Sequence, residues 1–440
     1  SVLLDATEGH VTMIHALHQA GAAVDQQNAR KQSAMQKACS LGKLTAMHCL
    51  LECGASLQLI GPHGWTLLHA SVHHNHPAMF SLLKDNHFEI SSVDDQGSTA
   101  LHLACSEGLL SWVKQLIEAK IDLHHFNAQG LQAWHLAILG DQLEIVQYLV
   151  HMGADVQSKA SGGMTALHMA ASIQKQTDLS RYLLTLPLDI NATTESGMTP
   201  LSAAIVTGNV PFCQMLLEKE ALTTGVIDDK GRTLLHLAVS KQLHWLVEAL
   251  LKRGDIDVNA ISSRGWTALH EAAKVDDDGS LSKLLLSAGA DPDAQSVDPA
   301  SSSKGWTPTI TAVQKDKANA LRVIVAAGAN TSLTDHEGWS PLHFACAHKK
   351  GELVKILLKS KASTSQPTSS GWLPMHICAF FGFLEGGKLL WKSGASTTAL
   401  DAEEKSPADY ATANKRTKFA QFLRYSKDPR TVSLALALRE

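Results

Sequence analysis

Two short stretches of the sequence come close to motifs that carry chemistry. Residues 270–274 read HEAAK, which misses the H-E-x-x-H zinc-protease motif because Lys274 stands where the second histidine ligand is needed. Residues 382–389 read GFLEGGKL and resemble a phosphate-binding G-x-x-x-x-G-K loop, but Leu389 replaces the required Ser or Thr. This second stretch also lies in an expected helix rather than between a strand and a helix. We therefore interpret both matches as coincidences.

The 23 histidines raise the question of a metal site, above all where five of them fall between residues 63 and 76. His69 and His73 share a helix face there, but no cysteine or third fixed ligand joins them, and structural zinc needs four ordered ligands. Four of the seven cysteines stand at small-residue or core positions of expected helices and are interpreted as core packing: Cys39, Cys105, Cys346 and Cys378. We predict no metal ligand and no cofactor. Since no catalytic triad or carboxylate pair is apparent either, we expect no enzyme.

The bulk composition narrows the choice of partners. Lys and Arg total 38 against 42 Asp and Glu, so the chain is nearly neutral, and a nucleic-acid partner is not expected. Basic residues concentrate only near the C-terminus, within residues 415–430. No apolar run approaches the length of a membrane span, so we expect no membrane insertion. Seven cysteines are few and odd in number, which favours a reducing compartment, the cytoplasm or the nucleus.

A four-letter phrase of the type T-P-L-H returns along the chain in steps of 33 or 34 residues, apart from one step of 40. A fixed period of this length indicates a stacked-repeat architecture rather than several separate domains. The phrases begin at positions 33, 66, 99, 132, 165, 199, 233, 267, 307, 340, 373 and 406.

The letters around each phrase predict one helix pair per period. Most phrases open with Thr or Ser, which can cap a helix, and several continue with Pro, which suits the first helical position. Small residues such as Ala104-Cys105 follow and let the first helix pack closely. Apolar pairs such as Leu357-Leu358 mark a second helix, and a Gly such as Gly394 ends it.

Together the tetrad, the small pair, the leucine pair and the closing Gly-Ala resemble the ankyrin repeat. The resemblance implies an all-α solenoid of about 12–13 helix-pair repeats joined by β-hairpin-like loops, running continuously over residues 1–424. A C-terminal tail, 425–440, would follow. The first repeat, near residues 3–10, lacks its tetrad, and the last one turns polar on its outer helix as a terminal cap does. Eight of the tetrads end in histidine, and in the ankyrin family this residue is expected to hydrogen-bond between the helix cap and the adjacent backbone.

One position, directly after the turn glycine of each repeat, carries large side chains on the hairpin finger at the edge of the expected concave groove. Four successive repeats have Trp there and would form a ladder. Trp is enriched at interface hot spots, and contiguous aromatic surface marks interaction sites. The alternative is a structural role, in which each indole covers the neighbouring hairpin. We predict a partner-binding groove that contains Trp65, Met164, Met198, Trp266, Glu271, Trp306, Trp339, Phe344, Trp372 and Phe380.

Two features near the tryptophans refine this hypothesis. Acidic residues outnumber basic ones between residues 261 and 300, so indoles and carboxylates together could hold a Lys or Arg of a basic peptide. A solvated acidic loop is the alternative. The single long step places a Pro- and Ser-rich finger at residues 292–304, beside Trp306, and insertions in repeat arrays often mark the binding face. A merely tolerated loop remains the other interpretation.

Three hypotheses for function follow. The first is a non-catalytic scaffold that binds a protein or an extended peptide along the concave groove. The second is that the chain is the ankyrin-repeat portion of a larger enzyme or channel, whose active part lies beyond residue 1 or residue 440. The third is a bacterial effector that acts on host proteins through an ankyrin array.

Overall fold

The computed structural model describes residues 4, 6, 7, 11–173, 178–221, 228, 230–297 and 303–426, and it divides into two compact units, residues 1–221 and 222–440. The regular elements of the described residues are the α-helices α2 to α26 and two single 3-10 turns, Pro62–Gly64 and Ser161–Gly163. Pairing between extended residues is limited there to two isolated bridges, Val93 with Thr99 and Ala160 with Met164. The prediction of an all-α, helix-pair solenoid is confirmed.

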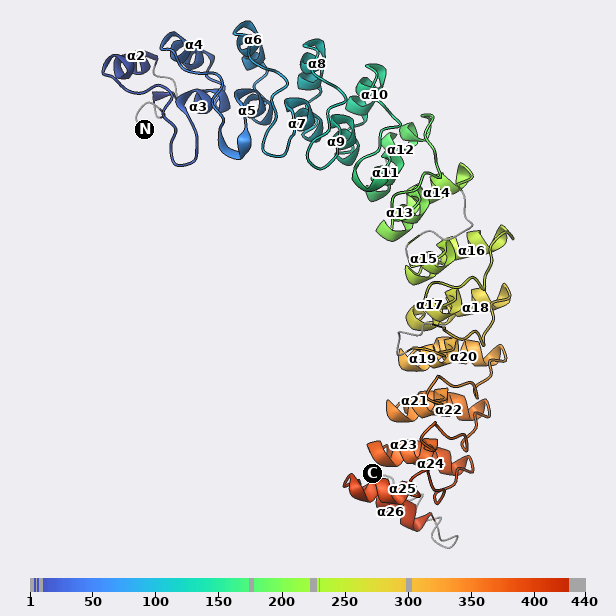
Figure 1. Cartoon of the computed structure of the whole chain (residues 1–440). Helices are drawn as coiled ribbons and strands as arrows, with labels where there is room; N and C mark the ends of the chain where they lie inside the picture. Colours follow the sequence, from blue (N-terminus) through green and yellow to red (C-terminus); the bar gives the residue numbers. More distant parts are fainter. Residues whose placement is uncertain are drawn as a thin grey trace. The chain divides into compact units, whose positions relative to one another are not determined.

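In the first unit the helices form two rows that alternate along the chain (Figure 1). The row of first helices, each of which begins within a tetrad, is α3 (Ala34–Ser40), α5 (Leu67–His73), α7 (Ala100–Ser106), α9 (Ala133–Leu139), α11 (Ala166–Ser172) and α13 (Pro200–Thr207). The row of second helices is α2 (Val11–Gln19), α4 (Leu44–Glu52), α6 (Ala78–Asp85), α8 (Leu110–Glu118), α10 (Leu143–His151), α12 (Asp178–Leu183) and α14 (Val210–Glu218).

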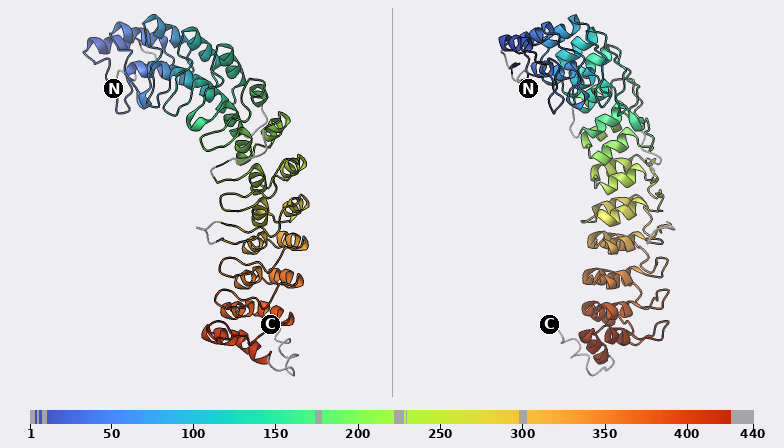
Figure 2. Two further views of the ribbon diagram at one scale, coloured as in Figure 1. Left: turned by 45° about the vertical axis from the view of Figure 1, so that its right-hand side comes forward. Right: turned by 60° about the vertical axis from the view of Figure 1, so that its left-hand side comes forward.

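The second unit repeats the same two-row arrangement. Its first helices are α15 (Leu234–Ser240), α17 (Ala268–Val275), α19 (Pro308–Gln314), α21 (Pro341–Ala347), α23 (Pro374–Phe381) and α25 (Pro407–Ala413). Its second helices are α16 (His244–Lys252), α18 (Ser280–Ser287), α20 (Ala318–Ala326), α22 (Gly351–Lys359), α24 (Leu384–Lys392) and α26 (Thr417–Tyr425). The loops that precede the first helices, here called fingers, project beyond that row (Figure 2).

Each tetrad opens a first helix at the expected residue. In the described repeats the first residue of the tetrad is the N-cap in every case: Ser33, Thr66, Thr99, Gln132, Thr165, Thr199, Thr233, Thr267, Thr307, Ser340, Leu373 and Ser406. Leu373 departs from the pattern because its side chain has no acceptor atom. Its backbone N–H is nevertheless satisfied by Nδ1 of His376, at 3.1 Å.

The tetrad histidines join neighbouring repeats, as the family resemblance implied. The backbone N–H of Thr267 donates to Nδ1 of His270 (3.1 Å), and Nε2 of the same ring lies 3.0 Å from the carbonyl oxygen of Trp306 in the next repeat. Both bonds are made at once only by a neutral ring that carries its proton on Nε2. Burial supports this form, since it lowers the pKa of His270 to about 4.

The fingers stack on one another through their backbones. The N–H of Ser369 donates to the carbonyl of Glu337 in the preceding finger (2.9 Å). Gly338 makes this approach possible, because a Cβ there would lie 2.8 Å from the nitrogen of Ser369, and because its φ of +78° is one that only glycine adopts readily. The turn glycine of the repeat therefore serves both the finger and its neighbour.

The core is distributed along each unit between the two helix rows. Small residues of the first helices, such as Ala272 and Ala345, are fully buried, and so are second-helix leucines such as Leu285 and Leu357. Each repeat is thus stabilised by contacts with its neighbours rather than by one central core. The continuous array over residues 1–424 stays a prediction, and most of the expected tail, residues 427–440, lies outside the described residues.

Candidate functional site

The four tryptophans between residues 266 and 372 stand at one equivalent position in successive fingers of the second unit, and each is half-buried: Trp266, Trp306, Trp339 and Trp372. Among the described residues no two indoles stack on each other, so the expected ladder is interrupted. Phe344 of α21 lies between two of them instead, Trp306 and Trp339. Neighbouring side chains cover part of each indole, as the structural alternative expects, and the partner-binding role stays a prediction.

Phe344, on α21, links two of the fingers. Its ring centroid lies 6.2 Å from that of Trp306 and 5.1 Å from that of Trp339, and the three rings form one continuous aromatic patch. Phe344 is itself only half-buried. These three residues were all predicted for the groove, and the structure brings them together.

Trp372 and Phe380 form the next part of the aromatic surface, with their centroids 5.3 Å apart. A residue that the sequence did not suggest holds them. Tyr410 of α25 lies 4.7 Å from the Trp372 ring, its hydroxyl accepts from Nε1 of Trp372 (3.2 Å), and it donates to Oδ2 of Asp401 (2.5 Å). Burial and the neighbouring Asp401 carboxylate raise the pKa of Tyr410 to about 12. This indole is therefore held by one hydrogen bond and by the rings of Phe380 and Tyr410.

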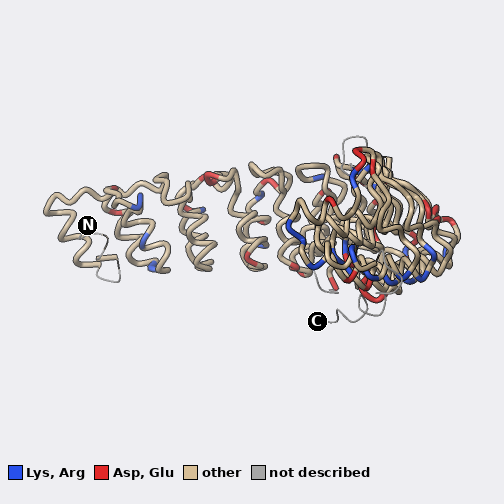
Figure 3. Tube along the Cα trace, turned by 90° about the horizontal axis from the view of Figure 1, so that it is seen from below, with Lys and Arg blue, Asp and Glu red and all other residues tan. Residues whose placement is uncertain are grey.

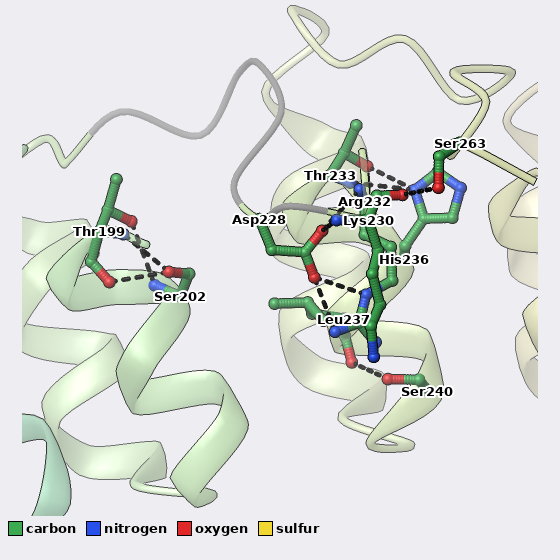
Figure 4. Close-up of polar contacts among 10 residues, drawn as sticks. All are labelled: Thr199, Ser202, Asp228, Lys230, Arg232, Thr233, His236, Leu237, Ser240 and Ser263. Carbon is green, nitrogen blue, oxygen red and sulfur yellow. Dashed lines mark hydrogen bonds and ion pairs between the residues drawn. The ribbon is translucent and has the colours of Figure 1, made fainter. Parts of the chain in front are cut away.

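Trp266 lies in a pocket of about 190 Å³ whose charged lining is mostly basic. Its lining residues are Lys230, Arg232, Ser262, Ser263, Arg264, Trp266, Glu271 and Lys274. Two of the four cations have carboxylate partners: Arg232 is paired with Asp228 at 2.7 Å (Figure 4), and Lys274 with Glu271 at 3.4 Å. Nζ of Lys274 also lies 5.9 Å from the Trp266 ring centroid, so this indole already has a cation–π contact within the chain.

Lys230 and Arg264 are the remaining cations of this pocket. Within the described residues neither forms an ion pair. The backbone around them is fixed, because the carbonyl of Lys230 accepts both from the N–H of Ser263 (2.9 Å) and from its hydroxyl (2.8 Å; Figure 4). Two uncompensated positive side chains thus border a defined cavity on the finger side of the second unit.

Of the nearby acidic residues that the structure describes, Glu271 lines the Trp266 pocket, whereas Asp276 and Asp277 make contacts elsewhere. The buried carboxylate of Asp276 accepts from the backbone N–H groups of Gly279 (3.0 Å) and Ser282 (2.8 Å), and so caps the start of α18. Asp277 pairs with Lys317, at 2.5 Å. These contacts remove the support for a basic partner, since the carboxylates serve the chain's own structure. In Figure 3, positive and negative residues are interspersed along the chain.

The long finger is closed at its base beside Trp306. The backbone N–H of Ser296 donates to the carbonyl of Trp306 (2.9 Å), and the N–H of Trp306 donates to the hydroxyl of Ser296 (2.9 Å). Ser296 also donates to the carbonyl of Ser303, which joins the two ends of the finger. Residues 298–302, between these ends, lie outside the described residues, so the binding role predicted for this finger stays a prediction.

The other predicted groove residues belong to the first unit. Trp65 is half-buried and lies 4.7 Å from the ring of His73, whose Nδ1 is 2.6 Å from Glu107. Met164 is 40% exposed, and Met198 is half-buried with its carbonyl bonded to His168. Among the described residues, no hydrogen bond or ring pair joins these three side chains to one another.

The motif-like stretches have structural explanations. His270 uses both ring nitrogens to join two repeats, as described above. In the stretch 382–389, Gly386 and Gly387 lie inside α24, where a Cβ would meet the ring of Phe383 at 2.3 Å or the ring of Phe419 at 2.6 Å. They are therefore packing glycines. All seven cysteines are buried free thiols, in agreement with the packing role predicted for four of them.

None of the described helices combines the length and the apolar character needed to cross a lipid bilayer. A search of the curated proteins gives no match. The family model for ankyrin repeats, built on three copies, matches residues 3–94, 75–160, 156–224, 221–296 and 269–368. Since these matches extend over most of the sequence and the helix pairs, caps and fingers agree with them, this chain belongs to the ankyrin-repeat family.

Proposed function

We propose that this protein is a non-catalytic scaffold that binds a segment of a partner protein along the finger side of its second unit. Ankyrin repeats act in general as protein-interaction scaffolds, so the class of function follows from the family. The surface proposed for this chain consists of the aromatic patch (Trp306, Phe344, Trp339), the neighbouring pair Trp372 and Phe380, and the basic pocket beside Trp266. The observation that carries the proposal is that half-buried aromatic rings gather in two groups on three successive repeats, Trp306 with Phe344 and Trp339, and Trp372 with Phe380.

The aromatic patch supplies the apolar part of the interface. Each ring is held by a neighbour, so little side-chain freedom is lost when a partner covers it, and preorganised contacts of this kind favour affinity. Large aromatic side chains dominate interface energies, and truncation of a hot-spot residue typically costs 2 kcal/mol or more, as an order of magnitude. A partner segment with apolar or aromatic side chains suits this surface.

The sequence predicted negative charge beside the tryptophans, but most charged residues that line the pocket beside Trp266 are positive. Lys230 and Arg264 offer positive charge that no described carboxylate neutralises, and the pocket of about 190 Å³ has room for one small side-chain group. Hydrogen bonds to a charged group are among the stronger ones. The partner segment is therefore proposed to place an acidic group, a carboxylate or a phosphate, beside Trp266.

The test is capture of partner proteins from an extract of cells that make the protein. The intact chain is compared with a Trp306→Ala, Trp339→Ala variant and with a Trp391→Ala variant. Trp391 is a half-buried indole of α24, in the row of second helices, and so is a matched control. Partners recovered by the intact chain and the control, but lost with the double variant, support the finger side. Equal recovery by all three chains would contradict it.

The charge determinant has its own test. Peptides of one apolar sequence, with a central Glu, phosphoserine, Ser or Lys, are titrated against the intact chain and against Arg264→Glu. The intact chain is expected to prefer the acidic peptides, and the Arg264→Glu variant to lose that preference. Lys283→Glu, at an exposed position of α18, is the control and is expected to keep it. The two acidic peptides together distinguish a carboxylate ligand from a phosphate ligand.

A further inference from the structure

A group of metal-binding side chains that the interaction surface does not use lies in the first unit. His15 of α2, Cys49 of α4 and Cys53, the C-cap residue of α4, each offer one ligand atom, and these atoms all lie within 4.8 Å of one another. The Sγ of Cys53 is 3.7 Å from Nδ1 of His15. In a tetrahedral zinc site, bond lengths of about 2.3 Å to sulfur and 2.0 Å to nitrogen place two ligand atoms roughly 3.5–3.8 Å apart.

The helix geometry explains why these residues converge. Cys53 is the C-cap of α4, and its backbone N–H donates to the carbonyl of Cys49, so the four-residue spacing brings the two side chains to the same side of the helix end. Helix α4 packs against α2, where His15 follows the buried Ile14. Both cysteines are buried, while the side chain of His15 is 45% exposed. The group is therefore preformed on two packed helices and open to solvent on the histidine side.

A fourth residue completes the arrangement. Oε2 of Glu52 lies 3.6 Å from Nε2 of His15, on the side of the ring opposite to the cysteines. Metal-bound histidines usually donate their second ring N–H to a carboxylate, which fixes the tautomer and directs the free nitrogen to the metal. Glu52 stands where such a positioning residue is needed.

We propose that His15, Cys49 and Cys53 bind Zn²⁺, with Glu52 as the positioning residue and water as the fourth ligand. Thiolate and imidazole ligands select a soft or borderline cation such as Zn²⁺ over Mg²⁺ or Ca²⁺. On binding, each thiol loses its proton to solvent as its bond to the metal forms, and the proton of His15 stays on Nε2, facing Glu52. Cys49 then gives up its weak contact with the carbonyl of Val11, at 3.7 Å.

The physical consequence is local stabilisation. In a repeat stack each repeat is held by contacts with its neighbours. Among these contacts α2 packs against α4. A metal ion that joins His15 to Cys49 and Cys53 would stabilise this contact by mass action, because it binds the folded form alone.

Co²⁺ serves as the spectroscopic probe, titrated into the full chain under reducing conditions. One equivalent is expected to give a thiolate-to-cobalt charge-transfer band and the intense visible bands of a tetrahedral site, both removed by Zn²⁺. His15→Gln and the pair Cys49→Ser, Cys53→Ser are expected to lose them, and Glu52→Gln to bind about 10–100-fold more weakly. His18→Gln, an exposed histidine of α2, and Cys105→Ser, a buried thiol of α7, are matched controls that should bind unchanged.

Circular dichroism and hydrogen exchange distinguish loss of the metal site from misfolding of a variant. Because the His15 side chain is half-exposed, His15→Gln should keep the helical circular dichroism of the intact chain. In hydrogen exchange, Zn²⁺ is expected to protect the amides of residues 11–19 in the intact chain and not in His15→Gln. A folded intact chain without the charge-transfer band, or the same band in the double cysteine variant, would overturn the proposal.

Discussion

Nε2 of His270 lies 3.0 Å from the carbonyl oxygen of Trp306, so the imidazole of one repeat holds the backbone of the tryptophan in the next. The same relationship joins His236 to Trp266 (2.8 Å) and His343 to Trp372 (3.1 Å). The tetrad histidine, which bonds to the N-cap of its own helix, thus also holds the backbone of the proposed interaction surface in the neighbouring repeat. Fold and proposed function depend on one set of hydrogen bonds.

The first prediction concerns the stability of the fold at acidic pH. Burial lowers the pKa of several tetrad histidines to about 4, from an ordinary value of 6.5: His102, His135, His270 and His343. The unfolded chain therefore binds more protons between these values. Stability should be complete above pH 6.5 and fall as the pH drops from 6.5 toward 4, by on the order of 3 kcal/mol for each imidazole. Urea unfolding followed across this range measures the slope.

The chain itself offers a control for this effect. In the first tetrad Gln36 replaces histidine and makes equivalent bonds, since its Oε1 accepts from the N–H of Ser33 (2.8 Å) and its Nε2 donates to the carbonyl of Leu59 (3.0 Å). His270→Gln should therefore keep most of the stability at pH 7 and reduce the loss in acid. An acid loss as large as in the intact chain would show that His270 does not contribute to it.

The second prediction concerns the N-cap without an acceptor. Leu373→Thr would place a hydroxyl beside Nδ1 of His376, as in the repeats that begin with Thr. The gain is expected to be about 0.5–2 kcal/mol in the free energy of unfolding of the second unit. Chemical denaturation measures it, with Thr267→Leu as the opposite change, expected to destabilise by a similar amount.

The third prediction concerns Tyr410. Tyr410→Phe removes the hydroxyl that joins Asp401 to Nε1 of Trp372, and leaves a buried carboxylate and an indole N–H without this partner. A loss of about 1–3 kcal/mol is expected. Tyr148→Phe, at a half-buried tyrosine of α10, is the control. Equal effects of the two substitutions would contradict the network described for Trp372.

The fourth prediction separates steric contact from backbone strain at glycines. Gly371 has a φ of +80°, and a Cβ there would lie 2.5 Å from the nitrogen of Ala402 in the next finger. Gly328 has a φ of +93° and open space around its Cβ position. Gly371→Ala should therefore destabilise the second unit more than Gly328→Ala, because Gly328→Ala introduces backbone strain without a steric clash. Thermal unfolding of the two variants gives the comparison.

The fold could be predicted from the sequence because the recurring tetrad marks the residue at which each first helix begins. Thr267 and Thr307 are N-caps despite the 40-residue step between them, since the local signal of the tetrad does not depend on the spacing. The positions of the tryptophans follow from the same register. Their surroundings do not, because contacts such as that of Trp372 with Tyr410 join residues 38 positions apart.

Charge and metal chemistry were the least predictable parts. The excess of acidic residues between 261 and 300 predicted negative charge around the tryptophans. In the structure Asp276 is buried and caps a helix, and Arg264 lines the pocket of Trp266. The group of His15, Cys49 and Cys53 has no contiguous motif. Its one sequence signal is the four-residue spacing of two cysteines, and the histidine comes from another helix.

The most direct test of the central claim places a photo-cross-linking phenylalanine analogue at one of two half-buried aromatic positions, 344 on α21 or 391 on α24. Irradiation in an extract of the cells that make the protein, followed by mass spectrometry, identifies what each position touches. If a partner binds the finger side of the second unit, we expect cross-links to a partner protein from position 344 and few or none from position 391. Cross-links from position 391 alone would contradict it.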